Sequence, residues 1–265
     1  MTKVAAIQMI STPDVATNIA TAARLVAEAA ARGATLVSLP EYWPIMGLQD
    51  TDKVGHAEAD GAGPIQDFMA AAARDHGIWL AGGTLPLSSP DAGKVMNTTL
   101  VYNPHGEAVG RYDKIHLFGF NKGDEAYDEA RTIVPGKNVV TFDAPFGKVG
   151  LAVCYDLRFP ELFRAMGNCT LMLVPAAFTH TTGSAHWEVL LRARAIENQC
   201  YVLAAAQGGT HASGRRTYGH SMLIDPWGKV TALLEEGEGV VIGDIDKALI
   251  DSVRASLPAL QHRRL

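Results

Sequence analysis

Three side chains that together could carry out acyl transfer each stand beside an apolar run of the sequence. Cys154 follows the run at 149–153, Glu41 follows the run at 36–39 and one proline, and Lys114 precedes an isoleucine. A carboxylate, an ammonium group and a thiol supply a base, a cation for a developing oxyanion and a nucleophile. These residue types therefore indicate a cysteine-dependent acyl-transfer site, provided that the fold brings them together.

The surroundings of Cys154 favour a nucleophilic role. The Gly-bounded run at 149–153 predicts a buried strand, and Pro160 suits the first turn of a helix. The thiol then lies at the carboxyl end of a strand, where α/β proteins bind ligands. The alternative is that Cys154 is a small buried hydrophobe, as free cysteines usually are. This stretch alone does not decide between the two.

Glu41 and Lys114 also have plain alternatives when each is taken singly. A carboxylate directly after a core strand suits a general base, but Glu41 could simply solvate a loop. An ammonium group among apolar neighbours either extends to water or pairs inside the protein, so Lys114 could be a surface cation. The occurrence of a base, a cation and a nucleophile in similar settings favours the catalytic interpretation of all three.

The composition is that of an ordinary globular protein and excludes several classes of function. The 265 residues are 48% hydrophobic and 19% charged, with a net charge of −5 and no basic stripe, which argues against a nucleic-acid partner. The first nine residues predict a strand and not a signal peptide, and no apolar run reaches the ~18 residues of a membrane span. Cys154, Cys169 and Cys200 lack the spacing of disulfide or zinc frameworks. We therefore expect a reducing cytoplasmic setting, no membrane contact, no metal and no cofactor.

The elements that position these residues follow from hydrophobic periodicity and turn signals. Strands are expected at 3–9, 34–39, 78–84, 97–102, 107–112, 138–142, 149–153, 170–174, 201–206, 219–224, 230–234 and 239–245, and helices at 18–31, 64–76, 161–166, 186–199 and 246–255. Two strand-rich halves with two covering helices each predict two sheets packed face to face, in a single α/β domain over residues 1–265. The polar segment 120–136 has little periodicity and is predicted to be a loop over the site.

The candidate residues lie in motifs that resemble the nitrilase superfamily of carbon–nitrogen hydrolases. The motifs are Leu-Pro-Glu at 39–41, Tyr-Asp-Lys-Ile-His-Leu-Phe at 112–118 and Cys-Tyr-Asp-Leu-Arg-Phe-Pro-Glu at 154–161, with further matches at 175–179, 185–187, 192–198, 219–222 and 225–228. Within the superfamily the chain is most similar to the Nit-type ω-amidases. Among these it resembles the deaminated glutathione amidases, with which it shares the closing pattern at 257–264.

This resemblance implies a four-layer α-β-β-α sandwich that usually forms a homodimer through one helical face, with a higher homo-oligomer as the alternative. It carries the catalytic roles over to Glu41, Lys114 and Cys154. It also implies a second glutamate between the lysine and cysteine motifs, for which Glu129 fits best and Glu125 is the fallback. The backbone N–H of Tyr155 is expected to join Lys114 in holding the oxyanion.

Residues near the cysteine motif and at the start of the helix at 186–199 are candidates for substrate contacts. They are Arg158, Phe178, Thr179, His186 and Trp187. A guanidinium group suits a substrate carboxylate, although Arg158 could instead form a structural ion pair with Glu161 or Asp156. Trp187 is expected to form part of the pocket wall.

The predicted function is hydrolysis of a small carboxylate-bearing amide through a thioester, with deaminated glutathione as the preferred substrate. Two alternatives remain open within the superfamily: an ω-amidase acting on α-ketoglutaramate, and an N-carbamoyl amino acid hydrolase. A different class, a catalytically silent binding member of the fold, is disfavoured because the three catalytic residues are intact.

Overall fold

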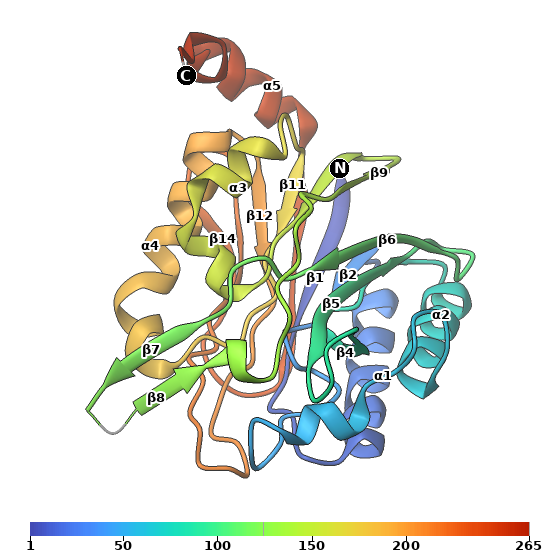
Figure 1. The fold of residues 1–265 in the computed structure, drawn as a ribbon. Coiled ribbons are helices and arrows are strands. Elements are labelled where there is room, and N and C mark those ends of the chain that lie inside the picture. Colours follow the sequence, from blue (N-terminus) through green and yellow to red (C-terminus); the bar gives the residue numbers. More distant parts are fainter. Residues whose placement is uncertain (124, 265) are drawn as a thin grey trace.

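The strands of the computed structural model, which describes residues 1–123 and 125–264, form two sheets that lie between two pairs of helices (Figure 1). The first sheet has seven strands in the order β15-β1-β2-β3-β5-β4, with β6 paired to β5. Its strands are β1 (Thr2–Gln8), β2 (Leu36–Ser38), β3 (Trp79–Ala81), β4 (Leu85–Ser88), β5 (Val95–Tyr102), β6 (Ala108–Asp113) and β15 (Gly239–Ile245). Within it, β1, β2 and β3 run parallel.

The second sheet has six strands in the order β14-β13-β12-β11-β10-β9. They are β9 (Thr141–Ala144), β10 (Gly147–Leu151), β11 (Leu171–Leu173), β12 (Tyr201–Ala204), β13 (Ser221–Ile224) and β14 (Val230–Leu234). Its central strands β10, β11 and β12 run parallel, and their burial on both faces explains why they read as continuous apolar runs.

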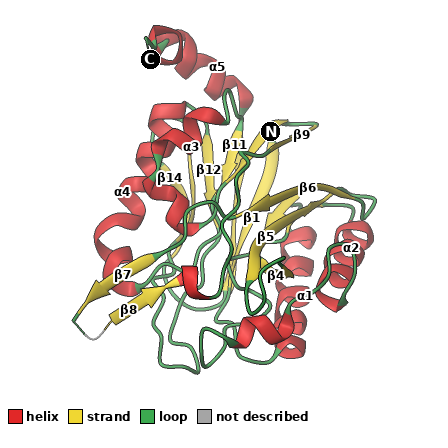
Figure 2. Cartoon of the chain, viewed as in Figure 1, coloured by secondary structure: helices red, strands yellow, loops and turns green. Residues whose placement is uncertain are grey.

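The side-chain alternation of β1 shows how the layers form. Val4 and Ala6 face the other sheet, whereas Ala5 and Ile7 pack towards α1 (Val15–Ala31) and α2 (Pro64–His76). On the far side, α3 (Pro160–Ala165) and α4 (His180–Asn198) cover the second sheet, as Figure 2 shows. The predicted four-layer α-β-β-α sandwich is therefore confirmed.

Two further helical features complete the chain. Helix α5 (Lys247–Ser256) begins at the expected N-cap Asp246 and extends beyond the edge of the sandwich (Figure 1). Short 3-10 helices span Asp52–His56, Glu129–Arg131, Cys154–Arg158 and Ala259–His262. Within the described ranges, no helix combines the length and the apolar character that crossing a bilayer requires.

The carboxyl ends of the parallel strands from both sheets meet at one edge of the sandwich. Parallel bridges join Met9 to Gln207 and Ala176 to Ala206, so the segments that follow β1, β11 and β12 lie side by side. Glu41 lies just after β2, and Cys154 lies just after β10. The topology thus places the candidate base and nucleophile at the same edge, where α/β proteins bind ligands at the carboxyl ends of their strands.

Strand β4 (Leu85–Ser88) was not expected from the sequence, and two further expectations about secondary structure were wrong. The segment 120–136, of which residue 124 lies outside the described residues, is not a loop throughout, because β7 (Gly119–Lys122) and β8 (Glu125–Asp128) pair as antiparallel strands. Each strand has only four residues, too few to show alternation in the sequence, and the hairpin gains support from aromatic contacts between Phe118 and Tyr127. Helix α4 begins at His180, six residues before the expected start at 186, because the Thr179 hydroxyl caps the N–H of Thr182.

Candidate active site

The side chains of Glu41, Lys114 and Glu129 form a buried charge cluster. The Lys114 ammonium lies 2.9 Å from Glu41 Oε1, and 3.0 and 2.7 Å from the two Glu129 oxygens. The Lys114 side chain is fully buried, and those of Glu41 and Glu129 are 1% and 13% exposed. Cys154 is buried beside this cluster, and the Glu41 carboxylate is close enough to raise the pKa of its thiol. Four residues from separate segments therefore share one site.

The backbone around Lys114 and Cys154 is held on both sheets. The N–H of Lys114 donates to the Asn97 carbonyl at 3.0 Å, and its carbonyl accepts from Gly136 at 2.8 Å. The N–H of Cys154 donates to the Pro175 carbonyl at 2.9 Å. Cys154 itself adopts a left-handed conformation with φ 50°, which turns the chain abruptly from β10 into the following 3-10 helix.

Glu41 is oriented by two donors that the sequence reasoning missed. The Asn97 amide donates to Oε1 at 3.0 Å, and the backbone N–H of Ala177 donates to Oε2 at 2.8 Å. Both carboxylate oxygens are therefore engaged before any substrate arrives. A buried asparagine within the apolar strand β5 was the signal available for Asn97, whereas a backbone donor such as Ala177 leaves no signature in residue type.

Glu129, and not Glu125, lies beside Lys114. Its carboxylate also accepts hydrogen bonds from the Tyr42 hydroxyl at 2.7 Å and the Phe118 N–H at 2.8 Å. Burial opposes its ionisation, but Lys114 and these donors outweigh burial and lower the pKa of Glu129 below its ordinary value. Glu125 instead accepts from the Thr181 hydroxyl at 2.5 Å, on the first turn of α4.

The charges of the site hold Lys114 ionised and Cys154 protonated. Burial opposes the charge on Lys114, but Glu129 and Glu41 outweigh it and raise the pKa of the ammonium above its ordinary value. For Cys154, burial and then the Glu41 carboxylate raise the pKa well above that of a free thiol, against the opposing effect of Lys114. The resting site therefore contains a neutral thiol next to an ionised carboxylate–ammonium pair.

Asp156 fixes the turn that carries the thiol. This fully buried carboxylate accepts from the Tyr112 hydroxyl at 2.6 Å and from the N–H of Val153 at 2.9 Å. It also accepts from the N–H of His116 at 3.0 Å and lies 2.7 Å from that ring's Nδ1. The turn is thereby tied to the segment that contains Lys114.

Arg158 forms no ion pair with Glu161 or Asp156 in the part of the chain that the structure describes. Its guanidinium group lies over the rings of Tyr155 and Phe178, at 5.6 and 5.3 Å from their centroids. One guanidinium nitrogen is 3.3 Å from Nδ1 of the exposed His186. Arg158 therefore backs two aromatic walls of the site, and its contact with a substrate stays a prediction.

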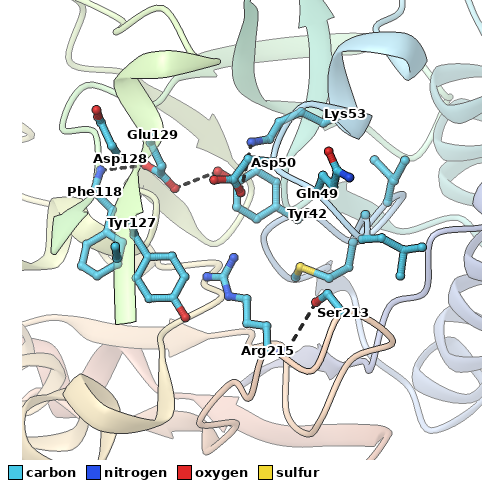
Figure 3. Close-up of a pocket in the computed structure, with 15 residues that line it drawn as sticks. Tyr42, Gln49, Asp50, Lys53, Phe118, Tyr127, Asp128, Glu129, Ser213 and Arg215 are labelled. Carbon is cyan, nitrogen blue, oxygen red and sulfur yellow. Dashed lines mark hydrogen bonds and ion pairs between the residues drawn. The ribbon is translucent and has the colours of Figure 1, made fainter. Parts of the chain in front are cut away.

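A small nook beside Cys154 and a larger outer cavity share the lining residues Phe118, Glu129 and Arg215. The nook has a free volume of about 10 Å³ and is lined by Phe118, Glu129, Cys154, Tyr155, Ala177, Phe178, Thr179, Thr182 and Arg215. The outer cavity has about 260 Å³, and Figure 3 shows its lining, which includes Tyr42, Lys53, Phe118, Tyr127, Glu129 and Arg215. Because the nook holds little more than one water-sized group, we expect the rest of a substrate to occupy the outer cavity.

The residues expected to touch substrate are divided between the nook and its surroundings. Phe178 and Thr179 line the nook directly. Trp187 is fully buried behind Phe178, with ring centroids 4.8 Å apart, and its indole N–H donates to the His220 carbonyl at 2.9 Å. Trp187 thus supports a wall of the nook from behind. Arg215, which lines both spaces, was not among the residues selected from the sequence.

Comparisons with known proteins agree with this geometry. A model of the carbon-nitrogen hydrolase family matches residues 3–255. The chain is 42% identical over 264 residues to the deaminated glutathione amidase of Synechocystis, covering 98% of this chain and 97% of that protein. The human protein of the same name is 41% identical, with 98% and 82% coverage.

Solved structures of similar fold also include members of this hydrolase family. The Saccharomyces cerevisiae protein Nit3 superimposes with a TM-score of 0.88 at 33% identity, over 100% of this chain and 97% of that one. The NitFhit protein of Caenorhabditis elegans gives a TM-score of 0.92 at 38% identity, over 99% of this chain and 65% of that one. An amidase from Nesterenkonia sp. AN1 gives 0.81 at 26% identity, over 98% and 100%, and its active-site cysteine has added to acrylamide. The chain belongs to the carbon–nitrogen hydrolase family.

Proposed function

We propose that this protein is a cysteine-dependent amidase that hydrolyses the C–N bond of a small carboxylate-bearing amide, with deaminated glutathione as its substrate. The observation that carries the proposal is the buried cluster of Glu41, Lys114 and Glu129 beside the Cys154 thiol. The deaminated glutathione amidases of Synechocystis and human, at 42% and 41% identity, support the choice of substrate.

In the proposed first half-reaction, Cys154 Sγ attacks the carbonyl carbon while Glu41 accepts the thiol proton. The oxyanion that forms is stabilised by Lys114 and by the N–H of Tyr155, which lies in the first turn of a 3-10 helix, where N–H groups lack helical partners. The C–N bond then breaks, Glu41 donates its proton to the leaving amine or ammonia, and a thioester remains on Cys154.

In the second half-reaction, Glu41 removes a proton from water, which attacks the thioester carbonyl. The C–S bond breaks, the proton returns through Glu41 to Cys154, and the acid leaves. Glu129 takes no proton in this scheme: its two carboxylate oxygens hold the Lys114 ammonium in place, at 3.0 and 2.7 Å. The raised pKa of Cys154 fits this order, because the thiol loses its proton to Glu41 only as the carbonyl is attacked.

The test is to incubate the purified protein with deaminated glutathione, α-ketoglutaramate and N-carbamoyl amino acids. Hydrolysis is measured as the release of ammonia or cysteinylglycine. We expect kcat/KM to be highest for deaminated glutathione, with cysteinylglycine as product, and a mass increase on Cys154 that matches the acyl group. Cys154→Ala serves as the inactive control. A higher kcat/KM for α-ketoglutaramate or a carbamoyl compound would reassign the substrate, and absence of both turnover and the adduct would support a silent binding member.

The proposal also includes a homodimer in a reducing cytoplasm, where Cys154 stays a free thiol. Light scattering at micromolar concentration tests the dimer, and a monomeric mass contradicts it. Location is tested by cell fractionation, and recovery outside the cytoplasmic fraction contradicts the expectation.

A further inference from the structure

Arg215 reaches the active site from the loop that follows β12 and lines both the nook beside Cys154 and the outer cavity. In Figure 3 its side chain points into the outer cavity between Tyr127 and Tyr42. One terminal nitrogen donates to the Ala177 carbonyl at 2.8 Å, and the guanidinium carbon lies 5.2 Å from the Tyr127 ring centroid. Arg215 therefore borders both the nook at the nucleophile and the outer cavity in which we expect the rest of a substrate.

The Arg215 guanidinium has unused hydrogen-bonding capacity. Its buried Nε has no hydrogen-bond partner, and among residues 1–123 and 125–264 no carboxylate lies within ion-pair distance of the group. A guanidinium group has five N–H donors, and the described protein groups use few of them. Leaving a buried donor unpaired is unfavourable. A ligand that supplies hydrogen-bond acceptors there would therefore bind more favourably.

The other charged groups of the outer cavity are already engaged. Lys53 donates to the Thr132 hydroxyl at 3.0 Å and lies 4.0 Å from Asp50. Asp128 caps the 3-10 helix that begins at Glu129. Arg215 is thus the lining cation most available to an incoming anion, and no lining carboxylate neutralises it.

The loop that carries Arg215 is fixed at its base. The buried His211 ring lies 2.9 Å from the Ser11 carbonyl and 2.9 Å from the Thr217 hydroxyl, and the N–H of His211 donates to the Arg215 carbonyl at 2.9 Å. A planar fork held in place before binding loses little conformational entropy when it binds a carboxylate.

We propose that Arg215 binds a carboxylate of the substrate and thereby selects acidic amides over neutral ones. This inference deepens the proposed amidase function and rests on it. The geometry favours Arg215 over Arg158, because Arg158 lines neither the nook nor the outer cavity. The carboxylate belongs either to the acyl half or to the leaving half of the amide, and both present the same chemistry to the guanidinium group.

Two pairs of amides that differ only in a carboxylate test the proposal. Glutaramate and pentanamide differ on the acyl side, whereas N-butanoylglycine and N-ethylbutanamide differ on the leaving side. We expect Arg215→Met to lower the ratio of kcat/KM for acid to neutral amide by roughly 10- to 100-fold in one pair, the range for a lost charged hydrogen bond. The affected pair identifies which half carries the carboxylate. Arg215→Lys, which keeps the charge but loses the fork, should lower the ratio less.

The matched control is Arg216→Met, because Arg216 is exposed, pairs with Glu236 and lines neither the nook nor the outer cavity. In this variant the ratio of kcat/KM for acid to neutral amide should equal that of the wild type. Equal losses for acid and neutral amides in both Arg215 variants would mean that Arg215 only supports Ala177 and hence Glu41, which overturns the proposal. A ratio that falls in Arg158→Met but not in the Arg215 variants also overturns it. If the wild type hydrolyses neutral and acid amides equally, this inference fails alone; if it hydrolyses no amide, the amidase function fails.

Discussion

Replacing Lys114 by alanine removes the cation that lies between two buried carboxylates. At the observed 2.9 and 2.7 Å, and with an effective dielectric constant near 20, each Lys114–carboxylate attraction is worth about 6 kcal/mol. Without the ammonium group, the Glu41 and Glu129 carboxylates lose the cation that balances them and lie close together with like charges.

The expected loss of activity exceeds that of one missing hydrogen bond. Removing a single oxyanion donor costs about 10²- to 10³-fold in kcat. Lys114→Ala removes such a donor and also removes the cation that pairs with both carboxylates, so we expect kcat/KM to fall by more than about 10³-fold. Breaking a buried ion pair by deleting one partner should also lower the free energy of unfolding by about 3–5 kcal/mol.

The assay combines amide hydrolysis at pH 7 with urea unfolding of the same preparations. Lys3→Ala is the control, because Lys3 pairs with Asp244 at 3.2 Å but both side chains are exposed, at 37% and 45%. Such a surface pair contributes only about 0.2–1 kcal/mol, and kcat/KM should stay at the wild-type value. A folded Lys114→Ala enzyme that retains most of its kcat would refute the charge-balance argument.

Further predictions concern the groups around this cluster. Asn97→Ala should lower kcat/KM by roughly 10- to 100-fold, because Glu41 loses a donor; an unchanged value contradicts this role. Glu129→Gln should lower kcat/KM far more than Glu125→Gln, and equal losses would contradict the assignment. Because the pKa of Glu129 is lowered, its ionised carboxylate stabilises the folded state above about pH 4.3, and this contribution is lost as the pH falls. In Glu129→Gln, the free energy of unfolding measured with urea should therefore decrease less between neutral and acidic pH than in the wild type. Because the pKa of Cys154 is raised, its alkylation rate, followed by peptide mass spectrometry, should still increase with pH above about 8.5, the ordinary thiol value; a plateau below pH 8 contradicts this.

The parts of the site that could be predicted are those whose residue type is unusual for its setting. Glu41 and Lys114 are charged residues beside apolar runs, and Cys154 ends one, so hydrophobic patterning marks all three. The sandwich could also be predicted from the sequence, because its central parallel strands are buried on both faces and therefore appear as long apolar runs. Selecting Glu129 as the second glutamate also required the order of the family motifs, since hydrophobic patterning alone does not distinguish Glu129 from Glu125.

The parts that could not be predicted depend on contacts between distant segments. The donor to Glu41 from Ala177 is a backbone group, and any residue except proline provides one. Arg215 lies in a polar loop where an arginine is ordinary, and only the fold shows that its guanidinium group faces the cavity. The hairpin of β7 and β8 was missed because four-residue strands are shorter than the window in which alternation becomes visible.

Backbone strain at the site indicates that side-chain placement there takes precedence over local stability. Tyr42 and Cys154 have φ values of 56° and 50°, a left-handed conformation that costs a non-glycine residue roughly 1–2 kcal/mol. Glycine would relieve this strain, but it would remove the hydroxyl that holds Glu129 and the thiol itself. The conformation is maintained by hydrogen bonds from the N–H of Tyr42 to the Thr84 hydroxyl and from the N–H of Cys154 to the Pro175 carbonyl, each 2.9 Å long. Because Tyr42 contacts Glu129 and Cys154 lies beside Glu41, we interpret the strain as the means by which two strand ends bring the Tyr42 hydroxyl and the Cys154 thiol to the charge cluster.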